Sequence, residues 1–432
     1  MTRLLVRGGR VVDPSQGIDA RLDLLLEEGR VARLAERLEP PAGCEVLEAA
    51  GKVVAPGLID IHVHLREPGQ TAKETIASGA AAAAAGGFTA VACMANTQPV
   101  NDSALVTGAI LAAAGRAGLC RVHPIGAISK GLEGRELAPF GELVAAGCRA
   151  VSDDGRPVMS AELMRRALEY SQHFGIPVVQ HAQDLDLSGD GVMHEGVASA
   201  CCGMPGIPGV AEDVMVARDL VLLAEFGGRY HVAHLSTARS LALVREARAR
   251  GLAVTCEVTP HHLLLTDRAV LDSGLAADWK MQPPLRSQGD AAALLAGLAD
   301  GTIDAIATDH APHTPDEKAL EFQSAPFGVV GLETSLALGL DRLVGAGVIP
   351  LPRLIELMST GPARVLGLPG GTLAAGAPAD VTVIDLDREL DVVAARFASK
   401  SRNTPFAGWK LRGRAVATIV GGRVVWRLDA AE

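Results

Sequence analysis

The stretch Gly57-Leu-Ile-Asp-Ile-His-Val-His-Leu-Arg66 places two histidines inside a short apolar run. Residues 58–65 predict a buried strand that begins directly after the turn at Pro56 and Gly57. Because successive side chains of a strand point to opposite faces, His62 and His64 leave the same face. Two imidazoles on one face can hold one metal ion, so this strand is the starting point for predicting the fold.

Segments with strand patterns alternate with helical segments through the middle of the chain. This βαβα order predicts a parallel sheet. Eight such strands within roughly 300 residues favour a (β/α)8 TIM-type barrel over an open doubly wound sheet, and no dinucleotide-binding fingerprint follows any of them. The predicted strands are residues 58–65, 88–94, 122–128, 149–152, 177–181, 230–234, 253–258 and 303–308.

The helix that follows the first strand carries signals for both of its ends. Thr71-x-x-Glu74 predicts a capping box at its start. An Ala-rich body follows, and Gly86-Gly87 predicts its end.

Both ends of the chain consist of short β-like runs interrupted by Gly and Pro, unlike the middle. Near the C-terminus, Gly421-Gly422 lies between two apolar runs and predicts a β-hairpin. We therefore expect residues 1–55 and 370–432 to form a small composite β-sandwich domain beside a barrel of residues 56–369.

The composition argues against several classes of protein. A net charge of -10 without any basic stripe argues against binding to nucleic acid. An anionic substrate would have to be held against this charge by a few local Arg and His side chains. The seven cysteines are scattered and lack a C-x-x-C pattern, as expected for reduced thiols in the cytoplasm. No apolar segment reaches membrane-spanning length, and the first residues lack the apolar core of a signal peptide.

In barrels of this kind, catalytic groups collect at the carboxyl ends of the strands. Most of the predicted strands end in a residue that can bind metal or transfer a proton. One histidine at a strand end is usually structural, but this many matching strand ends are hard to explain in that way. Imidazoles and carboxylates without thiolates suit Zn²⁺, Mn²⁺ or Co²⁺. The residues at these ends are His62, His64, Asp153, Asp154, His181, His234, Asp309 and His310.

Two motifs resemble those of a known superfamily. Gly57-Leu-Ile-Asp-Ile-His-Val-His-Leu-Arg-Glu-Pro-Gly69 is similar to the first metal motif of the cyclic-amide hydrolases in the amidohydrolase superfamily. Ala307-Thr-Asp-His-Ala-Pro-His313 resembles the last motif of dihydroorotases, particularly the bacterial stand-alone type. The similarity extends into the C-terminal region and implies a barrel with a composite β-domain. Further matching motifs are Asn96-Thr97, Val151-Ser-Asp-Asp-Gly155, Val258-Thr-Pro-His-His262, Lys280-Met-Gln-Pro-Pro-Leu-Arg286, Pro326-Phe-Gly328 and Asn403-Thr-Pro-Phe406.

The resemblance implies a metal centre with one or two Zn²⁺ ions. Many relatives bridge two ions with a carboxylated Lys, whereas the fourth strand here offers Asp153 and Asp154. This departure resembles a branch of dihydroorotases with an Asp bridge and argues against hydantoinase. The spacing to His181 in the family favours Asp154 as the bridge and leaves Asp153 behind it. The implied ligands are His62, His64 and Asp309 for one ion, His181 and His234 for the second, and Asp154 for both.

The reaction that the resemblance implies is the reversible hydrolysis of the cyclic amide of (S)-dihydroorotate to N-carbamoyl-L-aspartate, in pyrimidine (UMP) biosynthesis. A hydroxide that bridges the metal ions would be the nucleophile, since metal lowers the pKa of bound water from about 15.7 to about 7. Asp309 would act as general base and then as general acid toward the leaving ring nitrogen. Such a group is typically worth about 10²–10⁴-fold in rate.

The substrate carries a carboxylate, and the family resemblance implies which residues would contact it. Arg66 offers a planar fork that suits a carboxylate. Gln282 replaces an Asn of the family, and Ala95 replaces a Pro next to Asn96. The expected substrate-binding residues are Arg66, Asn96 and His313 at the carboxylate, the backbone of Phe327 and Gly328 at the polar edges of the ring, and Gln282.

Two other interpretations stay open at this stage. The chain could be another cyclic-amide hydrolase, allantoinase or hydantoinase. It could also be a non-catalytic scaffold partner of aspartate carbamoyltransferase, although such chains lose ligands and every ligand position is filled here. A homo-oligomer and an association of the active enzyme with the transferase are both compatible with the sequence. Residues 312–326 are hypothesised to form a lid over the substrate.

Overall fold

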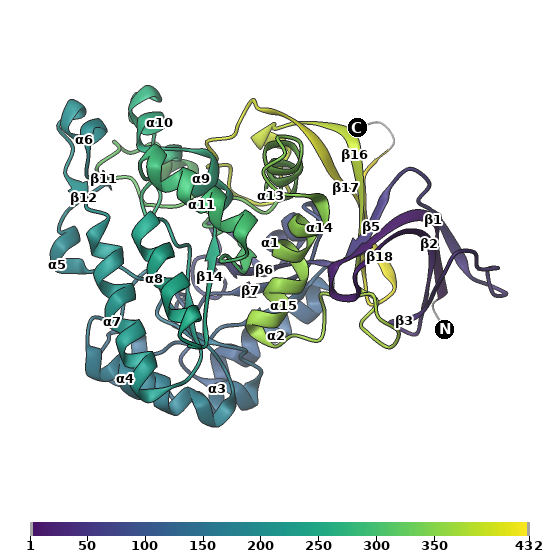
Figure 1. Cartoon of the computed structure of the whole chain (residues 1–432), viewed down its shortest axis with the longest axis horizontal. Helices are drawn as coiled ribbons and strands as arrows, with labels where there is room; N and C mark the ends of the chain where they lie inside the picture. The colour runs from purple at the N-terminus through teal and green to yellow at the C-terminus, as the bar shows by residue number, and fades with distance from the viewer. Residues whose placement is uncertain (1–2, 430–432) are drawn as a thin grey trace.

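The computed structural model describes residues 3–429 and contains a large region of parallel strands covered by helices, beside a mixed β-sheet (Figure 1). All eight predicted strands of the middle region are present, each overlapping its predicted residues. They are β6 Leu58–Val63, β7 Phe88–Cys93, β8 Arg121–Pro124, β9 Val151–Ser152, β10 Val178–Gln180, β13 Tyr230–Val232, β14 Val254–Val258 and β15 Ala305–Ile306.

These strands form two parallel sheets, one in the order β6-β7-β8 and one in the order β15-β14-β13-β10-β9. Single parallel bridges join the sheets at both edges, between Gly126 and Val151 and between Val63 and His310. The eight strands therefore follow one another in a cyclic order. Because all of them run in the same direction, their carboxyl ends lie at one end of the region and their amino ends at the other.

The helices lie outside the parallel strands, as Figure 1 shows. Within residues 3–429, no helix is both long and apolar enough to cross a membrane. The α-helices are α1 Ile76–Ala85, α2 Ala104–Ala117, α3 Phe140–Ala146, α4 Ala161–Ser171, α5 Leu185–Ser188, α6 Val197–Cys202, α7 Val210–Phe226, α8 Ala238–Ala249, α9 Pro260–Leu264, α10 Asp267–Asp272, α11 Gln288–Asp300, α12 Pro315–Lys318, α13 Ser335–Leu338, α14 Leu351–Ile355 and α15 Gly361–Leu366.

The start of α1 differs from the sequence prediction. Its capping box is formed by Thr75 and Ser78, whose side chains each bond to the other's backbone N–H. Glu74 is instead fully buried and accepts a hydrogen bond from the backbone N–H of Lys400 at 3.1 Å. The predicted Thr71–Glu74 box is therefore wrong, because a tertiary contact with the C-terminal region takes the Glu side chain away from the helix end.

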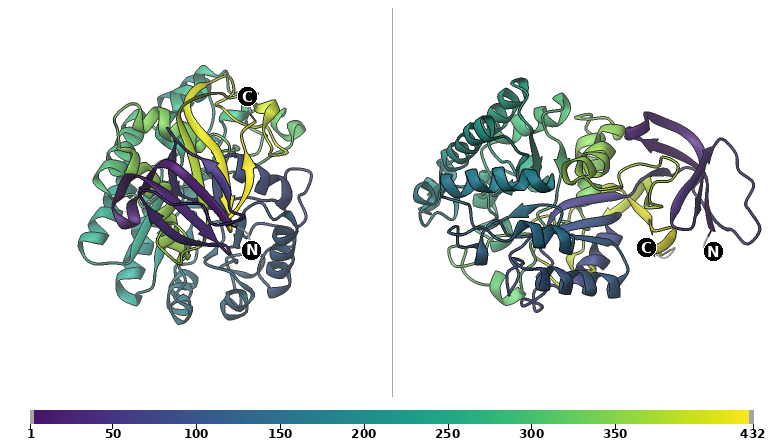
Figure 2. Two further views of the ribbon diagram at one scale, coloured as in Figure 1. Left: turned by 90° about the vertical axis from the view of Figure 1, so that its right-hand side faces the viewer. Right: turned by 90° about the horizontal axis from the view of Figure 1, so that it is seen from below.

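Strands from both ends of the chain share one mixed sheet in the order β18-β17-β16-β5-β1-β2-β3, with β4 paired to β1. Figure 2 shows this sheet at one side of the larger region. The strands are β1 Arg3–Asp13, β2 Ile18–Glu27, β3 Arg30–Ala35, β4 Glu45–Glu48, β5 Val53–Pro56, β16 Val381–Asp391, β17 Lys410–Val420 and β18 Arg423–Arg427; a separate pair is β11 Met193–His194 and β12 Gly206–Ile207.

The β-region is one hydrogen-bonded sheet rather than the two sheets of the predicted sandwich. The reason is β5, which pairs with β1 on one edge and with β16 on the other and so joins the two halves. The hairpin between β17 and β18 is confirmed. Its turn residues Gly421 and Gly422 have φ values of 57° and 75°, a conformation that a hairpin turn requires and that glycine adopts without strain.

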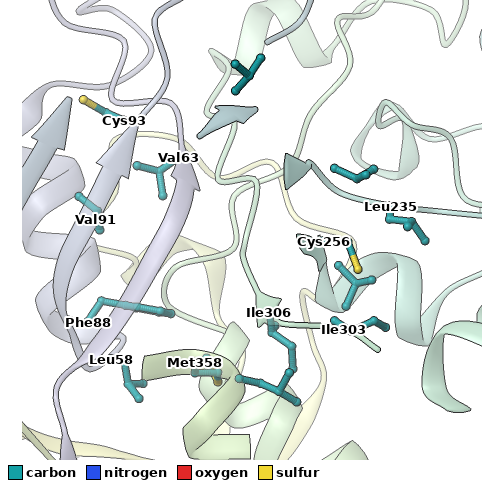
Figure 3. Packing of buried hydrophobic residues seen from close by; sticks show 14 of the residues in the cluster. Leu58, Val63, Phe88, Val91, Cys93, Leu235, Cys256, Ile303, Ile306 and Met358 are labelled. Carbon is teal, nitrogen blue, oxygen red and sulfur yellow. The ribbon is translucent and has the colours of Figure 1, made fainter. Parts of the chain in front are cut away.

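The main core lies between the parallel strands and the helices. Leu58 and Val63 of β6 pack there with Phe88 and Val91 of β7, all fully buried (Figure 3). A second buried cluster contains Ile59 from the start of β6 and small residues of the other strands, and α15 contributes to it. Close packing on both faces holds the short strands in fixed positions, so that side chains at their ends are held as well.

Candidate active site

Six of the predicted site residues follow or end parallel strands at their carboxyl ends. His62 is the fifth residue of β6, His64 directly follows that strand, and the others follow β9, β10, β13 and β15 within three residues. All are buried although they are polar or charged, and buried charges require partners. The six are His62, His64, Asp154, His181, His234 and Asp309.

One carboxylate, Asp154, lies between two pairs of histidines. Its Oδ1 is 3.4 Å from His62 Nε2 and 3.3 Å from His234 Nε2, and its Oδ2 is 3.4 Å from His64 Nε2. His181 Nδ1 lies 3.6 Å from Oδ1. Potential ligand atoms of His62, His64 and Asp154 lie within 4.8 Å of one another, as do those of Asp154, His181 and His234. The two groups share Asp154.

Asp309 faces the first pair of histidines. Its Oδ1 lies 3.0 Å from His64 Nε2 and 3.6 Å from His62 Nε2. Burial alone would raise the pKa of Asp309, but the imidazoles of His62 and His64 outweigh burial and hold this pKa below its usual range. Asp309 is thus a carboxylate beside the cluster, placed to serve as a ligand or as a proton acceptor.

The ring nitrogens of the cluster fit a bound divalent cation. His62 Nε2 is buried and has no hydrogen-bond partner within residues 3–429, although buried polar atoms are normally paired. His181 Nδ1 and His234 Nε2 face one another at 2.9 Å, an arrangement that a cation between them would stabilise. Imidazoles with carboxylates are a donor set that divalent transition metals and zinc accept.

Glu257 in β14 orients His62, a contact that was not predicted from the sequence. Its Oε1 accepts a hydrogen bond from His62 Nδ1 at 2.6 Å, and its Oε2 lies 3.2 Å from His231 Nε2. Burial would raise the pKa of Glu257, but His62 and His231 lower it to about 2. With Nδ1 protonated, the lone pair of His62 Nε2 points to Asp154. The only signal in the sequence was a single acidic residue inside an apolar strand.

A second group that the sequence analysis missed supports His181. Gln183 Oε1 lies 3.2 Å from His181 Nε2 and accepts a hydrogen bond from Gln282 Nε2 at 2.7 Å. Gln282, which replaces an Asn of the family, therefore contacts Gln183, the residue that contacts the candidate metal ligand His181. On the other side, Asn96 Oδ1 lies 2.9 Å from His64 Nδ1. Such contacts fix which ring nitrogen faces the metal.

Asp153 is turned away from this cluster. Its Oδ1 accepts hydrogen bonds from the backbone N–H groups of Ile128 at 2.8 Å and Ser129 at 2.9 Å, and Oδ2 accepts from the Ser129 hydroxyl. Burial raises the pKa of Asp153 to about 6. Of the two adjacent carboxylates, only Asp154 contacts the histidines.

A cavity of about 290 Å³ opens beside the cluster. Small-molecule sites are typically concave spaces in which a few polar groups converge. All six expected substrate-binding residues line this cavity, and so do five of the six candidate metal ligands. The lining includes Arg66, Asn96, Gln282, His313, Phe327 and Gly328, together with His64, Asp154, His181, His234 and Asp309.

Arg66 is the buried cation of the cavity. Its Nε donates to the carbonyl of Pro312 at 3.2 Å, and its Nη1 has no hydrogen-bond partner within residues 3–429. Burial lowers the pKa of Arg66 to about 10, which still leaves it charged at neutral pH. His313 Nε2 lies 3.5 Å from Arg66 Nη2 and donates to the carbonyl of Phe327 at 2.7 Å. A positive group therefore faces the cavity, where it can bind an anion.

The loop of residues 312–326 is held by two lysines that bind carbonyl groups. Lys318 Nζ donates to the carbonyls of Ala277 and Pro326, both at 2.9 Å. Lys280 Nζ donates to the carbonyl of Ala325 at 2.7 Å and lies 4.5 Å from the centre of the Phe327 ring. These contacts hold the loop against the cavity that Phe327 lines.

Asn403, from the C-terminal part of the chain, joins both sides of this loop. Its Nδ2 donates to the carbonyls of Ala311 and Gly328, both at 3.0 Å, and its Oδ1 accepts from the His313 N–H at 3.2 Å. Asn403 belongs to a motif recognised in the sequence, but no role was predicted for it.

Comparison with family models and curated proteins gives matches over nearly the whole chain. A model described as Dihydro-orotase-like matches residues 51–240, and one described as Amidohydrolase family matches residues 214–426. A dihydroorotase of Anaeromyxobacter dehalogenans strain 2CP-C is 58% identical over 98% of this chain and 97% of its own length. One of Pelotomaculum thermopropionicum is 56% identical over 98% of each chain.

Solved structures show the same mixed α/β fold. The L-hydantoinase (dihydropyrimidinase) from Arthrobacter aurescens superposes with a TM-score of 0.87 at 26% identity, over 99% of this chain and 96% of its own. The D-hydantoinase (dihydropyrimidinase) from Thermus sp. has a TM-score of 0.80 at 26% identity, over 98% and 96%. The curated relatives are thus about twice as similar in sequence as these structures are.

Proposed function

The chain belongs to the dihydroorotase family of amidohydrolases, and from this premise we propose how its buried side chains carry out the family's reaction. That reaction is the reversible hydrolysis of the cyclic amide of (S)-dihydroorotate to N-carbamoyl-L-aspartate, in pyrimidine biosynthesis, and this chain catalyses it. The assignment of roles rests on the position of Asp154. Two pairs of histidines share this carboxylate, and Asp309 and the cavity lie next to them.

We infer that the eight parallel strands form the (β/α)8 barrel that the sequence predicted. Their cyclic order, completed by the bridges at Gly126 and Val63, supports this inference. We likewise propose that residues 1–55 and 370–432 make up one β-domain beside a barrel of residues 56–369, since strands from both ends share one sheet.

We propose that the cluster holds Zn²⁺, as one or two ions. When bound at this position, a divalent metal would supply a Lewis acid for the scissile carbonyl and would lower the pKa of water from about 15.7 to about 7. Asp154 contacts all four histidines and so suits the bridging role. The proposed ligands are His62, His64 and Asp309 at one position, His181 and His234 at the other, and Asp154 at both.

Asp309 is proposed as the general base and acid. It lines the cavity and lies 3.0 Å from His64, so its carboxylate can accept a proton there and pass it to the leaving ring nitrogen. A carboxylate in this role must be ionised before the reaction begins, and the surrounding imidazoles favour the ionised form.

Arg66 and Asn96 are proposed to bind the substrate carboxylate. Arg66 presents a guanidinium to the cavity. The Oδ1 of Asn96 is engaged by His64, and its Nδ2 donates one hydrogen to the carbonyl of Asp154 at 3.5 Å, so the second N–H of Nδ2 is left to donate to an anion. His313 lies beside Arg66, and the backbone of Phe327 and Gly328 would contact the ring. Hydrogen bonds between such charged groups and a carboxylate are among the strong ones.

A hydantoinase activity is the second candidate, because solved hydantoinases share the fold. Hydantoin carries no carboxylate that would pair with Arg66, which favours dihydroorotate. The scaffold role alone is disfavoured, because all six proposed ligands are present and gathered at one site. A homo-oligomer and an association with aspartate carbamoyltransferase stay predictions. The seven cysteines are all free thiols, which supports the predicted cytoplasmic location.

The decisive experiment measures ring opening of dihydroorotate, hydantoin and allantoin by the purified, Zn²⁺-loaded chain. We expect turnover of dihydroorotate alone and a loss of about 10²–10⁴-fold in kcat for Asp309→Ala. Asp272→Ala, which removes an exposed carboxylate paired with Arg268, is the control. Comparable turnover of hydantoin would contradict the substrate assignment. No turnover of any of the three would support the scaffold role, to be tested by adding aspartate carbamoyltransferase.

A further inference from the structure

A second cavity, of about 330 Å³, lies at the amino ends of the parallel strands. Ile59, Ala90 and Arg121 line it, and each lies within the first three residues of its strand, β6, β7 and β8. The same β6 leads to His62 and His64. The cavity is therefore at the opposite end of the parallel strands from the proposed active site.

Both regions of the molecule contribute to this cavity. The mixed sheet supplies Glu28 to Arg30, in and after the turn between β2 and β3, and Asp380 next to β16. The segment that follows α15 supplies Leu368 to Gly371. Ligand sites are common where two structural units meet, because neither unit alone has to close the space.

The cavity has an excess of positive charge. Three arginines and two carboxylates line it. Asp380 pairs with Arg121 at 2.6 and 3.0 Å, and among the described residues the Arg30 guanidinium donates only to the carbonyl of Gly376. Arg149 is exposed, and its guanidinium has neither a hydrogen bond nor an ion pair within residues 3–429. Glu28, the second carboxylate, is exposed and forms no ion pair among the same residues.

His123 adds a neutral hydrogen-bonding group. Its ring has no partner within residues 3–429, and burial, followed by the charges of Arg149 and Arg121, lowers the pKa of His123 to about 4. At neutral pH the ring therefore offers one donor and one acceptor. Ile59, Ala90 and Leu368 provide apolar surface in the same cavity.

We propose that this cavity binds a small organic anion, a carboxylate or a phosphate monoester on an apolar or planar body. Arg149 and Arg30 bind the anionic group, since guanidinium forks match carboxylate and phosphate oxygens. His123 bonds to the body of the ligand, which lies against Ile59. A ligand there contacts Ile59 of β6, the strand that carries His62.

The test is isothermal titration calorimetry of the metal-loaded full chain with two probes, phenyl phosphate and benzoate. Arg149→Met should weaken binding of the preferred probe about tenfold or more, because one charge-assisted contact is lost. Arg149→Lys keeps the charge and should retain part of the affinity. Arg116→Met removes an exposed arginine of α2 and should have no effect. The probe that binds more tightly identifies the chemical class of the ligand.

A variant at the carboxyl ends of the strands distinguishes binding of the probe at this cavity from binding at the active site. Arg66→Met removes the cation of the active-site cavity, and binding of the probe should persist in it. Loss of binding in Arg66→Met, with Arg149→Met unaffected, would place the probe at the active site and overturn the proposal. Absence of binding to the unmodified chain would overturn it as well. The exposed guanidinium of Arg149 forms no hydrogen bond or ion pair within residues 3–429, so its variants are expected to remain folded.

Discussion

The carboxyl ends of the parallel strands gather four imidazoles and two carboxylates into one cluster, whereas the cavity at their amino ends is lined by three guanidinium groups and a single imidazole. At the carboxyl ends the charges are buried, and three of the four histidines of the cluster have a neighbour that orients them, as Glu257 orients His62. At the amino ends Arg149 and Glu28 are exposed and unpaired within residues 3–429. The same strands thus position a cluster suited to a metal ion at one end and exposed, unpaired charges at the other. The side chains at the strand ends, and not the strands themselves, determine the chemistry of each end.

The backbone shows the same difference. At the carboxyl ends Arg66, His234 and Asp309 have φ values of 59°, 32° and 47°, a conformation that costs non-glycine residues about 1–3 kcal/mol each. At the amino ends Glu28 has a φ of 51°, but with Gly29 it forms the two-residue turn between β2 and β3, which hairpins favour. Three of the five non-glycine residues with positive φ in segments that end or follow these strands are proposed site residues, and the other two are Leu132 after β8 and Leu275 after β14. The strain at Arg66, His234 and Asp309 is consistent with a functional reason for their positions.

Removal of metal should have the largest effect on activity, and it should affect the carboxyl ends of the strands without affecting the cavity at their amino ends. After treatment with a chelator and removal of the chelator by gel filtration, ring opening of dihydroorotate should be lost and should return with Zn²⁺. Binding of phenyl phosphate or benzoate at the cavity of about 330 Å³ that Arg149 lines, called the Arg149 cavity below, should not change. If chelation abolished probe binding as well, the two ends would not be independent. Metal content by mass spectrometry would also give the number of ions per chain.

Glu257→Gln should lower zinc affinity by about 10–100-fold, the usual effect of removing a group that orients a ligand. The amide cannot accept from both His62 and His231 in the way that the carboxylate does. Competition with a fluorescent zinc chelator measures the affinity. Glu225→Gln changes an exposed glutamate of α7 and serves as the control. Equal affinities of the two variants would show that Glu257 has no part in orienting His62.

Lys280→Met should raise KM for dihydroorotate by about three- to tenfold, since hydrogen bonds to a charged group contribute about 1.5–3 kcal/mol and part of the loop stays held by Lys318. It should also make residues 312–326 more sensitive to protease. Lys130→Met, at an exposed lysine paired with Glu136, is the control. Protease sensitivity of the unmodified chain that does not change on adding N-carbamoyl-L-aspartate would argue against a lid.

Asp380→Asn should have the smallest effect, a loss of about 1–2 kcal/mol in the free energy of unfolding, because the pair with the partly exposed Arg121 is weakened. Denaturant unfolding measures this loss. The change also removes a carboxylate from the Arg149 cavity, so the anionic probe should bind more tightly. Weaker binding would mean that Arg121 needs Asp380 to hold it in position.

The sequence by itself determined the positions of the parallel strands and the candidate residues at their ends. Apolar runs and their alternation are local properties, so residues 58–65 could be identified as a strand without knowledge of their partners. The position of His62 and His64 on one face follows from the two-residue period of a β-strand. The composite origin of the β-region was also predictable, because both ends share the same composition.

Only the tertiary structure decided how distant side chains meet. The contact between His62 and Glu257 joins residues 195 positions apart, and no local pattern predicts it. The N-cap of α1 is Thr75 and not the predicted Thr71, because Glu74 accepts a hydrogen bond from the backbone of Lys400. Pairing of β5 with both β1 and β16 joins the β-region into one sheet where two were predicted. The Arg149 cavity exists because two regions of the chain close around the amino ends of the strands. Long-range contacts depend on how elements pack, and that information is distributed over the whole chain.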